Sequence, residues 1–216
     1  MSHTPIVVYG AGGHGRETAL LIQTMIDAGA PFELRGFLDD RLELHGTLIG
    51  SHPVLGDASL LTEHPNHFDV ALGIGNPRAR RNTVERIRPW VREFPKLIHP
   101  GVPQWQRVSL AEGVQVHSGS ILTCDIVIGA FAILNRHVDI SHDCRLDDWA
   151  TLAPAVTLAG AVYVGEGADL GVRATCIPGV HVGAWSIIGA GAVVTSDIPD
   201  HVTAVGVPAR VLAKVS

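Results

Sequence analysis

A six-residue repeat runs through most of the second half of the chain. Every sixth residue from Leu110 to Val194 is aliphatic, except Cys176, and the residue two places before each is small or branched. Helices repeat every 3.6 residues and simple strands every two, so neither holds this register. Three hexads, each forming a short strand and a turn, can close a triangular coil. The pattern therefore predicts a parallel β-helix, and the unbroken register over fifteen hexads disfavours a β-sandwich with chance periodicity.

Glycine follows the inward aliphatic residue in five of the hexads. We expect these glycines to adopt backbone angles that a β-carbon disfavours; they are Gly129, Gly165, Gly171, Gly183 and Gly189. A stack of coils leaves an open end that would pair with other chains unless it is covered. Residues 201–216 leave the repeat, so we expect them to fold back over that end.

The first hundred residues alternate between strand and helix patterns. Strands are predicted at 5–9, 34–38, 69–74 and around 97–98, and helices at 16–28 and 79–91. Such alternation indicates a small parallel α/β unit. We therefore expect three parts: an α/β domain over residues 1–100, the β-helix over 101–200 and the covering segment over 201–216.

A glycine-rich turn at residues 10–15 joins the first strand to the first helix. Backbone N–H groups at a helix N-terminus attract phosphate, and Asp39, at the end of the second strand, stands where a ribose hydroxyl would bind. About 100 residues suit one nucleotide or a nucleotide-linked sugar better than a dinucleotide. Alternatively, the glycines serve only the packing of helix on strand. His14 could contact a ligand or be an ordinary loop residue.

The pair His142 and Asp143 is the strongest catalytic candidate in the repeat. A neighbouring carboxylate can fix the tautomer of an imidazole, and an imidazole can deprotonate an amine or hydroxyl nucleophile. The other interpretation is two adjacent surface residues. Cys144 and Cys176 occupy core positions of the repeat and should be inert thiols, so direct attack on a thioester is favoured over a covalent acyl-enzyme.

These motifs together resemble the bacterial nucleotide-sugar acetyltransferases of the sialic-acid and bacillosamine type. The matching segments are YGAGGHG at 9–15, FLDD at 37–40, IGN at 74–76, Asn135 with ISHDC at 140–144, and VGVPAR at 205–210. They span nearly the whole chain. The resemblance implies an N-terminal Rossmann-like α/β domain that binds the nucleotide sugar, a C-terminal left-handed β-helix that binds acetyl-CoA, and acetyl transfer to the amino group of a nucleotide-linked amino-deoxy sugar.

The resemblance also implies roles for individual residues. His142 matches the general base and Asp143 the acid beside it, which is Glu in most relatives. Gly160 matches a backbone N–H donor to the acetyl carbonyl, and Thr151 replaces a second His near the thioester. Main-chain contacts to the pantetheine arm fall on Val172 and Ala190. The positions that hold the nucleotide sugar are Gly13, His14, Gly15, Asp39, Asp40, Gly75 and Asn76.

The family forms its site between subunits, with CoA in the groove between adjacent β-helices, so a homotrimer is implied. Other classes are less compatible with the chain. A formal net charge of -5 gives no electrostatic case for nucleic acid, and three widely spaced cysteines favour neither disulfides nor thiolate zinc. No apolar run reaches the ~20 residues of a membrane span, and no signal pattern is present, so we expect a cytoplasmic protein.

Three rival functions stay open at this level. His137 and His142 are five residues apart and could, with His117, bind zinc between subunits, as in γ-class carbonic anhydrases. The α/β domain has no purpose in that enzyme, and we expect no metal. The acceptor could be a sugar hydroxyl instead of an amine, as in sialic acid O-acetylation. The chain could also be a non-catalytic nucleotide sensor, against which the His142–Asp143 pair argues.

Overall fold

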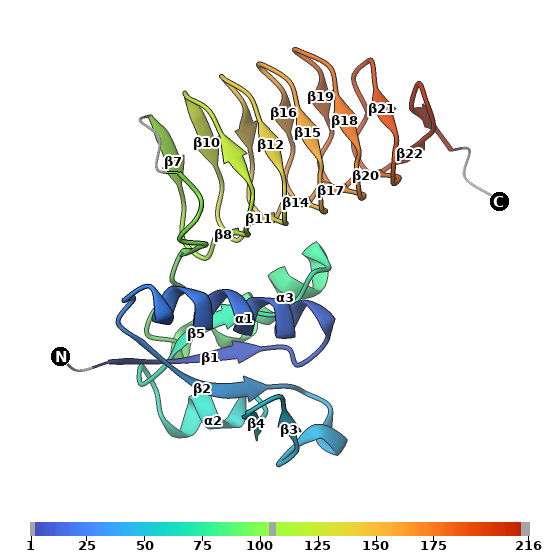
Figure 1. Cartoon of the computed structure of the whole chain (residues 1–216). Coiled ribbons are helices and arrows are strands. Elements are labelled where there is room, and N and C mark those ends of the chain that lie inside the picture. Colours follow the sequence, from blue (N-terminus) through green and yellow to red (C-terminus); the bar gives the residue numbers. More distant parts are fainter. Residues whose placement is uncertain (1–2, 104–106, 213–216) are drawn as a thin grey trace. The chain divides into compact units, whose positions relative to one another are not determined.

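The computed structural model describes residues 3–103 and 107–212. The chain forms two compact units, residues 1–100 and 101–216. Each unit has its own sheet architecture (Figure 1).

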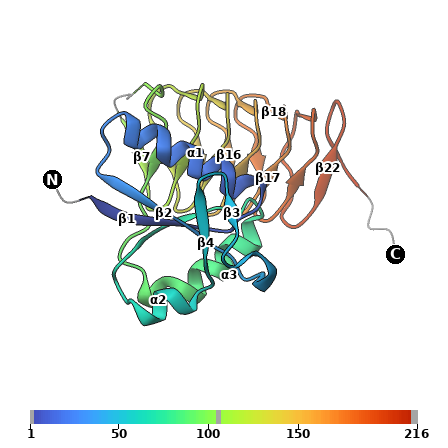
Figure 2. The ribbon, with the colours of Figure 1, turned by 60° about the horizontal axis from the view of Figure 1, so that its bottom comes forward.

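The N-terminal unit is built on one twisted sheet with the strand order β3-β4-β2-β1-β5. Its strands are β1 (Thr4–Tyr9), β2 (Phe32–Leu38), β3 (Leu48–Ile49), β4 (His52–Gly56) and β5 (Asp69–Leu72). All neighbours are parallel except β3 and β4, which form an antiparallel hairpin at the edge beyond β2 (Figure 2). The carboxyl ends of β1, β2 and β5 therefore meet at one edge, where α/β sheets bind ligands.

Helix α1 (Gly13–Asp27) packs along β1 and β2 and buries an apolar stripe against them. This cluster includes Ile22, Phe37 and Leu97, each at most 1% exposed. The remaining elements are α2 (Ser59–Glu63), α3 (Pro77–Ile87), β6 (Leu97–Ile98) and two 3₁₀ turns at Leu42–Leu44 and Arg88–Trp90.

The structure corrects several boundaries predicted for this unit, including the start of the second strand, which lies at Phe32 rather than at residue 34. The first helix begins at Gly13 rather than at residue 16, because the last glycines of the turn already take helical angles and form its first turn. The third strand ends at Leu72, two residues early, and residues 73–75 are irregular. The helix predicted over 79–91 starts at Pro77, capped by Asn76, and gives way after Ile87 to a 3₁₀ turn that contains a proline.

The second unit is a left-handed parallel β-helix with three walls of stacked strands (Figure 1). The first wall comprises β7 (Val108–Leu110), β10 (Ile126–Ile128), β13 (Arg145–Leu146), β16 (Tyr163–Val164) and β19 (His181–Val182). The second wall comprises β8 (Gln115–Val116), β11 (Ile133–Leu134), β14 (Thr151–Leu152), β17 (Asp169–Leu170), β20 (Ile187–Ile188) and β22 (Thr203–Val205). The third wall comprises β9 (Ile121–Leu122), β12 (Asp139–Ile140), β15 (Thr157–Leu158), β18 (Thr175–Cys176) and β21 (Val193–Val194). Paired residues in neighbouring strands differ by 18 positions, which is three hexads per coil.

The repeat's inward positions form the core of the β-helix as predicted. From Val116 to Val194, every sixth residue is at most 2% exposed. The small residues two places earlier are buried as well. Each fully buried Leu, Ile or Val contributes about 1.5–3 kcal/mol, so this column is the main source of stability in the unit.

The expectation for the repeat glycines was wrong. The positive φ angles fall three residues after the inward residue, at every sixth position from Arg107 to Gly191, and Asp143 is one of them (φ 60°). Gly129 and Gly171 instead lie where the next coil passes closely. A β-carbon would come 2.5 Å from the backbone N of Asp148 at Gly129, and 2.7 Å from that of Ala190 at Gly171. These glycines are therefore required for the close stacking of coils.

The end of the chain extends the second wall and then reverses. β22 adds to β20 in parallel, and β23 (Arg210–Val211) pairs with β22 antiparallel. The last described strand thus runs against the direction of the coils at the C-terminal end of the β-helix.

Candidate active site

His142 lies at the corner of the β-helix between β12 in the third wall and β13 in the first. Residues at the same corner on successive coils are Cys124, His142, Gly160 and Pro178, which are 18 residues apart. Backbone hydrogen bonds tie these coils together: Asp143 N–H donates to the Cys124 carbonyl (3.2 Å) and Ala161 N–H to the His142 carbonyl (2.8 Å). The backbone that carries His142 is therefore held on both sides.

The side chains of His142 and Asp143 form a hydrogen-bonded pair. Nδ1 of His142 lies 2.8 Å from Oδ2 of Asp143, and the two side chains are 62% and 61% exposed. The carboxylate favours the tautomer in which Nδ1 carries the proton, which leaves Nε2 as an acceptor. The pair is open to solvent, so a substrate can reach Nε2.

Gly160 provides the surface against which the imidazole lies. A β-carbon at this position would come 2.5 Å from Cε1 and 2.7 Å from Nε2 of His142. Among the hydrogen bonds of residues 3–103 and 107–212, none uses the N–H of Gly160. A proton acceptor and a backbone donor thus stand side by side on neighbouring coils.

The other residues expected to bind CoA lie elsewhere on the β-helix. Val172 and Ala190 stack at the corner between the second and third walls, where Gly191 N–H donates to the Val172 carbonyl (2.8 Å). Thr151 lies in β14 of the second wall and is 7% exposed. None of the three shares the corner of His142 within one chain.

Two buried thiols have the inert character expected of them. Cys144 donates to the carbonyl of Ala159 (3.1 Å), and burial raises its pKa. Burial also raises the pKa of Cys176 to about 12. Neither group can supply a thiolate nucleophile near neutral pH.

The glycines of the N-terminal unit near the glycine turn are of two kinds: some are packed against other backbone atoms, and others have open space where a side chain would be. A β-carbon on Gly15 would come 1.8 Å from the carbonyl oxygen of Gly10, so Gly15 allows α1 to meet β1. Gly12, Gly13 and Gly75 have no atom within 4 Å of a β-carbon position. The open glycines lie at the start of α1 and after β5, where a ligand can approach the backbone.

Asp39 is buried and holds the turn together. Its Oδ2 accepts from Ala11 N–H (2.7 Å), and its Oδ1 accepts from Nε of Arg41 (2.8 Å) and from Arg41 N–H (3.0 Å). The Arg41 guanidinium and the Ala11 N–H lower the pKa of Asp39 to about 2. This carboxylate therefore organises the site, and Asp40 is the more accessible acid of the two.

Asp40 belongs to a polar cluster at the carboxyl edge of the sheet. The hydroxyl of Tyr9 donates to Asp40, and the guanidinium of Arg86 in α3 donates to Asp40 Oδ2 (2.7 Å) and to the Tyr9 hydroxyl (2.8 Å). Burial, followed by the bond to Asp40, raises the pKa of the Tyr9 hydroxyl, and the bond to Asp40 raises the pKa of Arg86. We name these three residues the edge cluster.

The segment after β5 is fixed by two residues of α3. The Asn76 side chain accepts from Ala79 N–H (3.0 Å) and caps the helix. The buried guanidinium of Arg80 donates to the carbonyls of Ile74 (3.0 Å) and Gly75 (2.7 Å). The Asn76 side chain therefore serves as a helix cap, and the hydrogen bond from Arg80 fixes the backbone of Gly75 at the carboxyl edge of the sheet.

His14 lies in the first turn of α1 and is mostly buried, at 13% side-chain exposure. Its carbonyl accepts from the hydroxyl of Thr18 (3.0 Å), and its Nδ1 lies 3.8 Å from Glu17 Oε2.

The sequence analysis missed two arginines of this site, Arg86 and Arg80. Arg86 contacts side chains that are far from it in sequence, and Arg80 contacts backbone carbonyls, which no sequence motif marks. Only the placement of α3 beside the glycine turn could have indicated them.

Residues 3–103 and 107–212 contain no group of three or more His, Cys, Asp or Glu side chains placed to hold a metal ion. No helix in those ranges is long and apolar enough to cross a membrane.

Comparison with known proteins gives consistent matches over both units. The profile of the PglD N-terminal domain matches residues 5–87. GDP-perosamine N-acetyltransferase of Escherichia coli O157:H7 is 30% identical over 212 residues, which cover 94% of each chain. The chain belongs to the hexapeptide-repeat nucleotide-sugar acetyltransferases.

Solved structures agree with this assignment. A variant of perosamine N-acetyltransferase from Caulobacter crescentus, in complex with CoA and GDP-perosamine, is 35% identical with a TM-score of 0.87, and 97% of each chain is covered. The acetyltransferase domain of PglB from Neisseria gonorrhoeae, in complex with acetyl coenzyme A, is 31% identical with a TM-score of 0.79, over 97% of this chain and 100% of that one.

The predicted activity is thereby confirmed at the level of the family. The chain is an acetyl-CoA-dependent nucleotide-sugar N-acetyltransferase, with acetyl-CoA as the co-substrate. The carbonic anhydrase interpretation has no counterpart in these matches.

Proposed function

We propose that this enzyme acetylates a GDP-linked 4-amino sugar of the perosamine type. The observation that carries the proposal is the full-length similarity to two perosamine N-acetyltransferases, combined with an intact His142–Asp143 pair beside Gly160. The open glycines Gly13 and Gly75, with His14 and Asp40, are the contacts proposed for the nucleotide sugar. Gly15, Asp39 and Asn76 act behind them by shaping the turn.

The proposed reaction is a direct transfer. The neutral sugar amine attacks the carbonyl carbon of the thioester while Nε2 of His142 accepts a proton from the nitrogen. The Gly160 N–H donates to the oxyanion of the tetrahedral intermediate, a type of contact worth about 3 kcal/mol in other acyl transferases. The C–S bond then breaks, and the CoA thiolate takes the proton from the imidazolium. Asp143 holds the imidazole in the required tautomer throughout.

We also propose a homotrimer that binds CoA between neighbouring β-helices. His142 and Gly160 lie at one corner, whereas Val172 and Ala190 lie at another. In a groove between two β-helices, CoA would contact the corner of His142 on one subunit and the corner of Val172 and Ala190 on its neighbour. Thr151, in the second wall, would then belong to the same groove only through that assembly. Sedimentation equilibrium tests this: a trimer supports the arrangement and a monomer contradicts it.

The reaction is tested with acetyl-CoA and a panel of GDP-, UDP- and dTDP-linked 4-amino sugars, with products identified by mass spectrometry. The proposal predicts one added acetyl group on the GDP-linked sugar and an amide linkage that resists mild alkali. An alkali-labile ester would establish the O-acetyl alternative. Preference for another nucleotide would overturn the choice of GDP. The reaction is expected in the cytoplasm, as the sequence predicts.

A further inference from the structure

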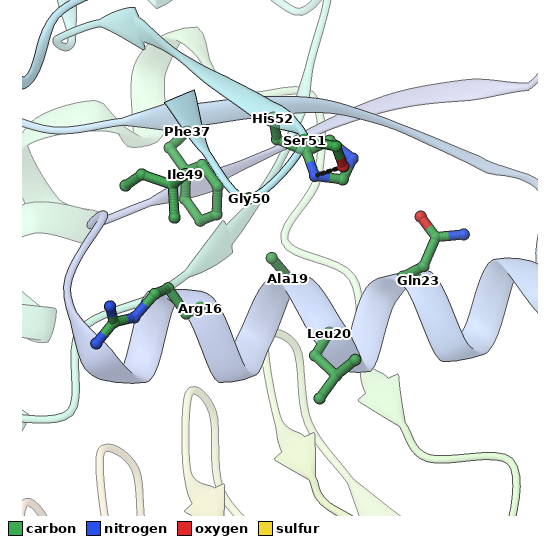
Figure 3. A pocket seen from close by; sticks show the side chains of 9 residues that line it. All are labelled: Arg16, Ala19, Leu20, Gln23, Phe37, Ile49, Gly50, Ser51 and His52. Atoms are coloured by element: carbon green, nitrogen blue, oxygen red, sulfur yellow. Dashed lines mark hydrogen bonds between the residues drawn. The ribbon is translucent and has the colours of Figure 1, made fainter. Parts of the chain in front are cut away.

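A pocket lies in the N-terminal unit between helix α1 and the β3–β4 hairpin (Figure 3). Its volume is about 270 Å³, and its lining comes from α1, β2 and the hairpin. The nine residues around it are Arg16, Ala19, Leu20, Gln23, Phe37, Ile49, Gly50, Ser51 and His52. The residues proposed to hold the nucleotide sugar are not among them.

The pocket has an apolar interior and polar ends. Figure 3 shows Ala19 facing Phe37 and Ile49 across the space, with Arg16 at one end and Gln23 at the other. Phe37 is 1% and Ala19 8% exposed, so these walls are fixed by the core of the unit. Such walls favour a ring or a branched alkyl group, which would bury apolar surface on binding.

The charges of the lining residues indicate that the ligand is negatively charged. None of the nine residues is Asp or Glu, although the chain as a whole has a net charge of -5. Arg16 carries the only permanent charge in the lining, and its guanidinium has no hydrogen bond or ion pair within residues 3–103 and 107–212. A guanidinium in this state can bind a carboxylate through two parallel hydrogen bonds.

The hairpin adds polar groups to the pocket. In the hairpin, the hydroxyl of Ser51 lies 3.3 Å from Nδ1 of His52. On α1, the side-chain Nε2 of Gln23 donates a hydrogen bond to Asp27 Oδ1 (2.9 Å). The volume is just below the range of about 300–1,000 Å³ for drug-sized ligands. A pocket of this size suits one ring with a short acidic arm.

We propose that this pocket is a second ligand site, which binds a small organic monoanion with an apolar body, such as an aryl carboxylate. The site is separate from the glycine turn and does not depend on acetyl transfer. Arg16 pairs with the carboxylate, and the ring lies between Ala19 and Phe37.

The test uses the full-length enzyme without acetyl-CoA and follows the ¹⁹F signal of 4-fluorophenylacetate. We expect the acid to bind saturably to the wild type. The neutral 4-fluorophenylacetamide should bind the wild type about tenfold more weakly than the acid does, and the acid should bind Arg16→Gln about tenfold more weakly than it binds the wild type. Arg35→Gln, which alters another exposed arginine of the same unit, should bind as the wild type does. Because Arg16 is exposed, the variant should keep its melting temperature.

Three results would overturn the proposal: no saturable binding of the acid, equal binding of the amide, or unchanged affinity in Arg16→Gln. Excess GDP should leave the ¹⁹F signal of the bound acid unchanged, and full displacement would place the acid in the nucleotide site instead. These outcomes are read without turnover, so they are independent of whether the proposed acetylation succeeds.

Discussion

The imidazole of His142 occupies the space that a side chain at Gly160 would need. A β-carbon on Gly160 would come 2.5 Å from Cε1 of the ring, which is far inside van der Waals contact. The two residues belong to consecutive coils, 18 positions apart, so the stacking of coils sets their relation. Gly160 therefore has two proposed functions: it presents an N–H and it leaves room for the base.

Gly160→Ala should displace the imidazole while leaving the core intact. We expect kcat to fall at least tenfold, because a misplacement of about 1 Å can cost 10²-fold in rate. The control is Gly179→Ala on the next coil, where a β-carbon meets no atom within 4 Å. Gly179 has a φ of +75°, and Ala161, which stands 18 residues earlier, already has a φ of 58°, so any cost of this backbone angle is read from the melting temperature. Steady-state kinetics and melting temperatures check this. A kcat equal to that of the control would show that the position of His142 is not set by Gly160.

Asp143→Asn keeps the shape of the pair but removes the carboxylate that accepts from Nδ1. We expect kcat to fall about tenfold or more, a fraction of the 10²–10⁴ that a general base provides. Because both side chains are more than half exposed, stability should change little. Initial rates at saturating substrates test this. Asp143→Glu should restore part of the rate, and an Asn variant with full activity would remove Asp143 from the mechanism.

The edge cluster gives a prediction about substrate binding. Arg86→Gln removes the cation that bonds to Asp40 and Tyr9, and leaves Asp40, a proposed contact of the nucleotide sugar, without its ion pair. We expect KM for the nucleotide sugar to rise about tenfold with kcat and KM for acetyl-CoA unchanged.

Arg81→Gln is the control for this variant, since Arg81 lies on the same helix and pairs with the exposed Glu85 rather than with the edge cluster. An equal effect of both substitutions would show that the edge cluster has no special part in binding.

Asp39 links stability to pH in the N-terminal unit. Its pKa falls from an ordinary 3.8 to about 2 on folding, so its contribution is present above pH 4 and is lost as the pH falls toward 2. The shift corresponds to about 2 kcal/mol. Asp39→Asn should therefore lower the free energy of unfolding by about this amount at pH 7.

Urea unfolding at several pH values measures that difference. The gap between wild type and Asp39→Asn should narrow as the pH is lowered from 4 toward 2. A gap that stays constant with pH would mean that the Ala11 and Arg41 contacts do not depend on the charge of Asp39.

The sequence predicted most of the fold because one residue in six alone defines the β-helix. Leu134, Leu152 and Leu170 stack in the second wall at the spacing that the repeat requires. The reason for the glycines could not be predicted, since the clash at Gly129 arises from a coil that lies 19 residues away, at Asp148. Close approach between coils is a tertiary property.

The candidate site was predictable only where neighbours in sequence act together. The adjacency of His142 and Asp143 was visible, and so was the glycine turn. Arg86 lies 77 residues from Tyr9 and 46 from Asp40, and no local pattern marks it. The β3–β4 hairpin was missed because its strands are short, with two and five residues, and because β4 contains both proline and glycine.

The most direct test of the central claim is turnover and CoA binding in His142→Ala. With acetyl-CoA and the GDP-linked 4-amino sugar, we predict a fall in kcat of about 10²–10⁴. CoA affinity, measured by calorimetry, should equal that of the wild type, because the corner backbone stays in place. Unchanged turnover in His142→Ala would contradict the assignment of His142 as the general base.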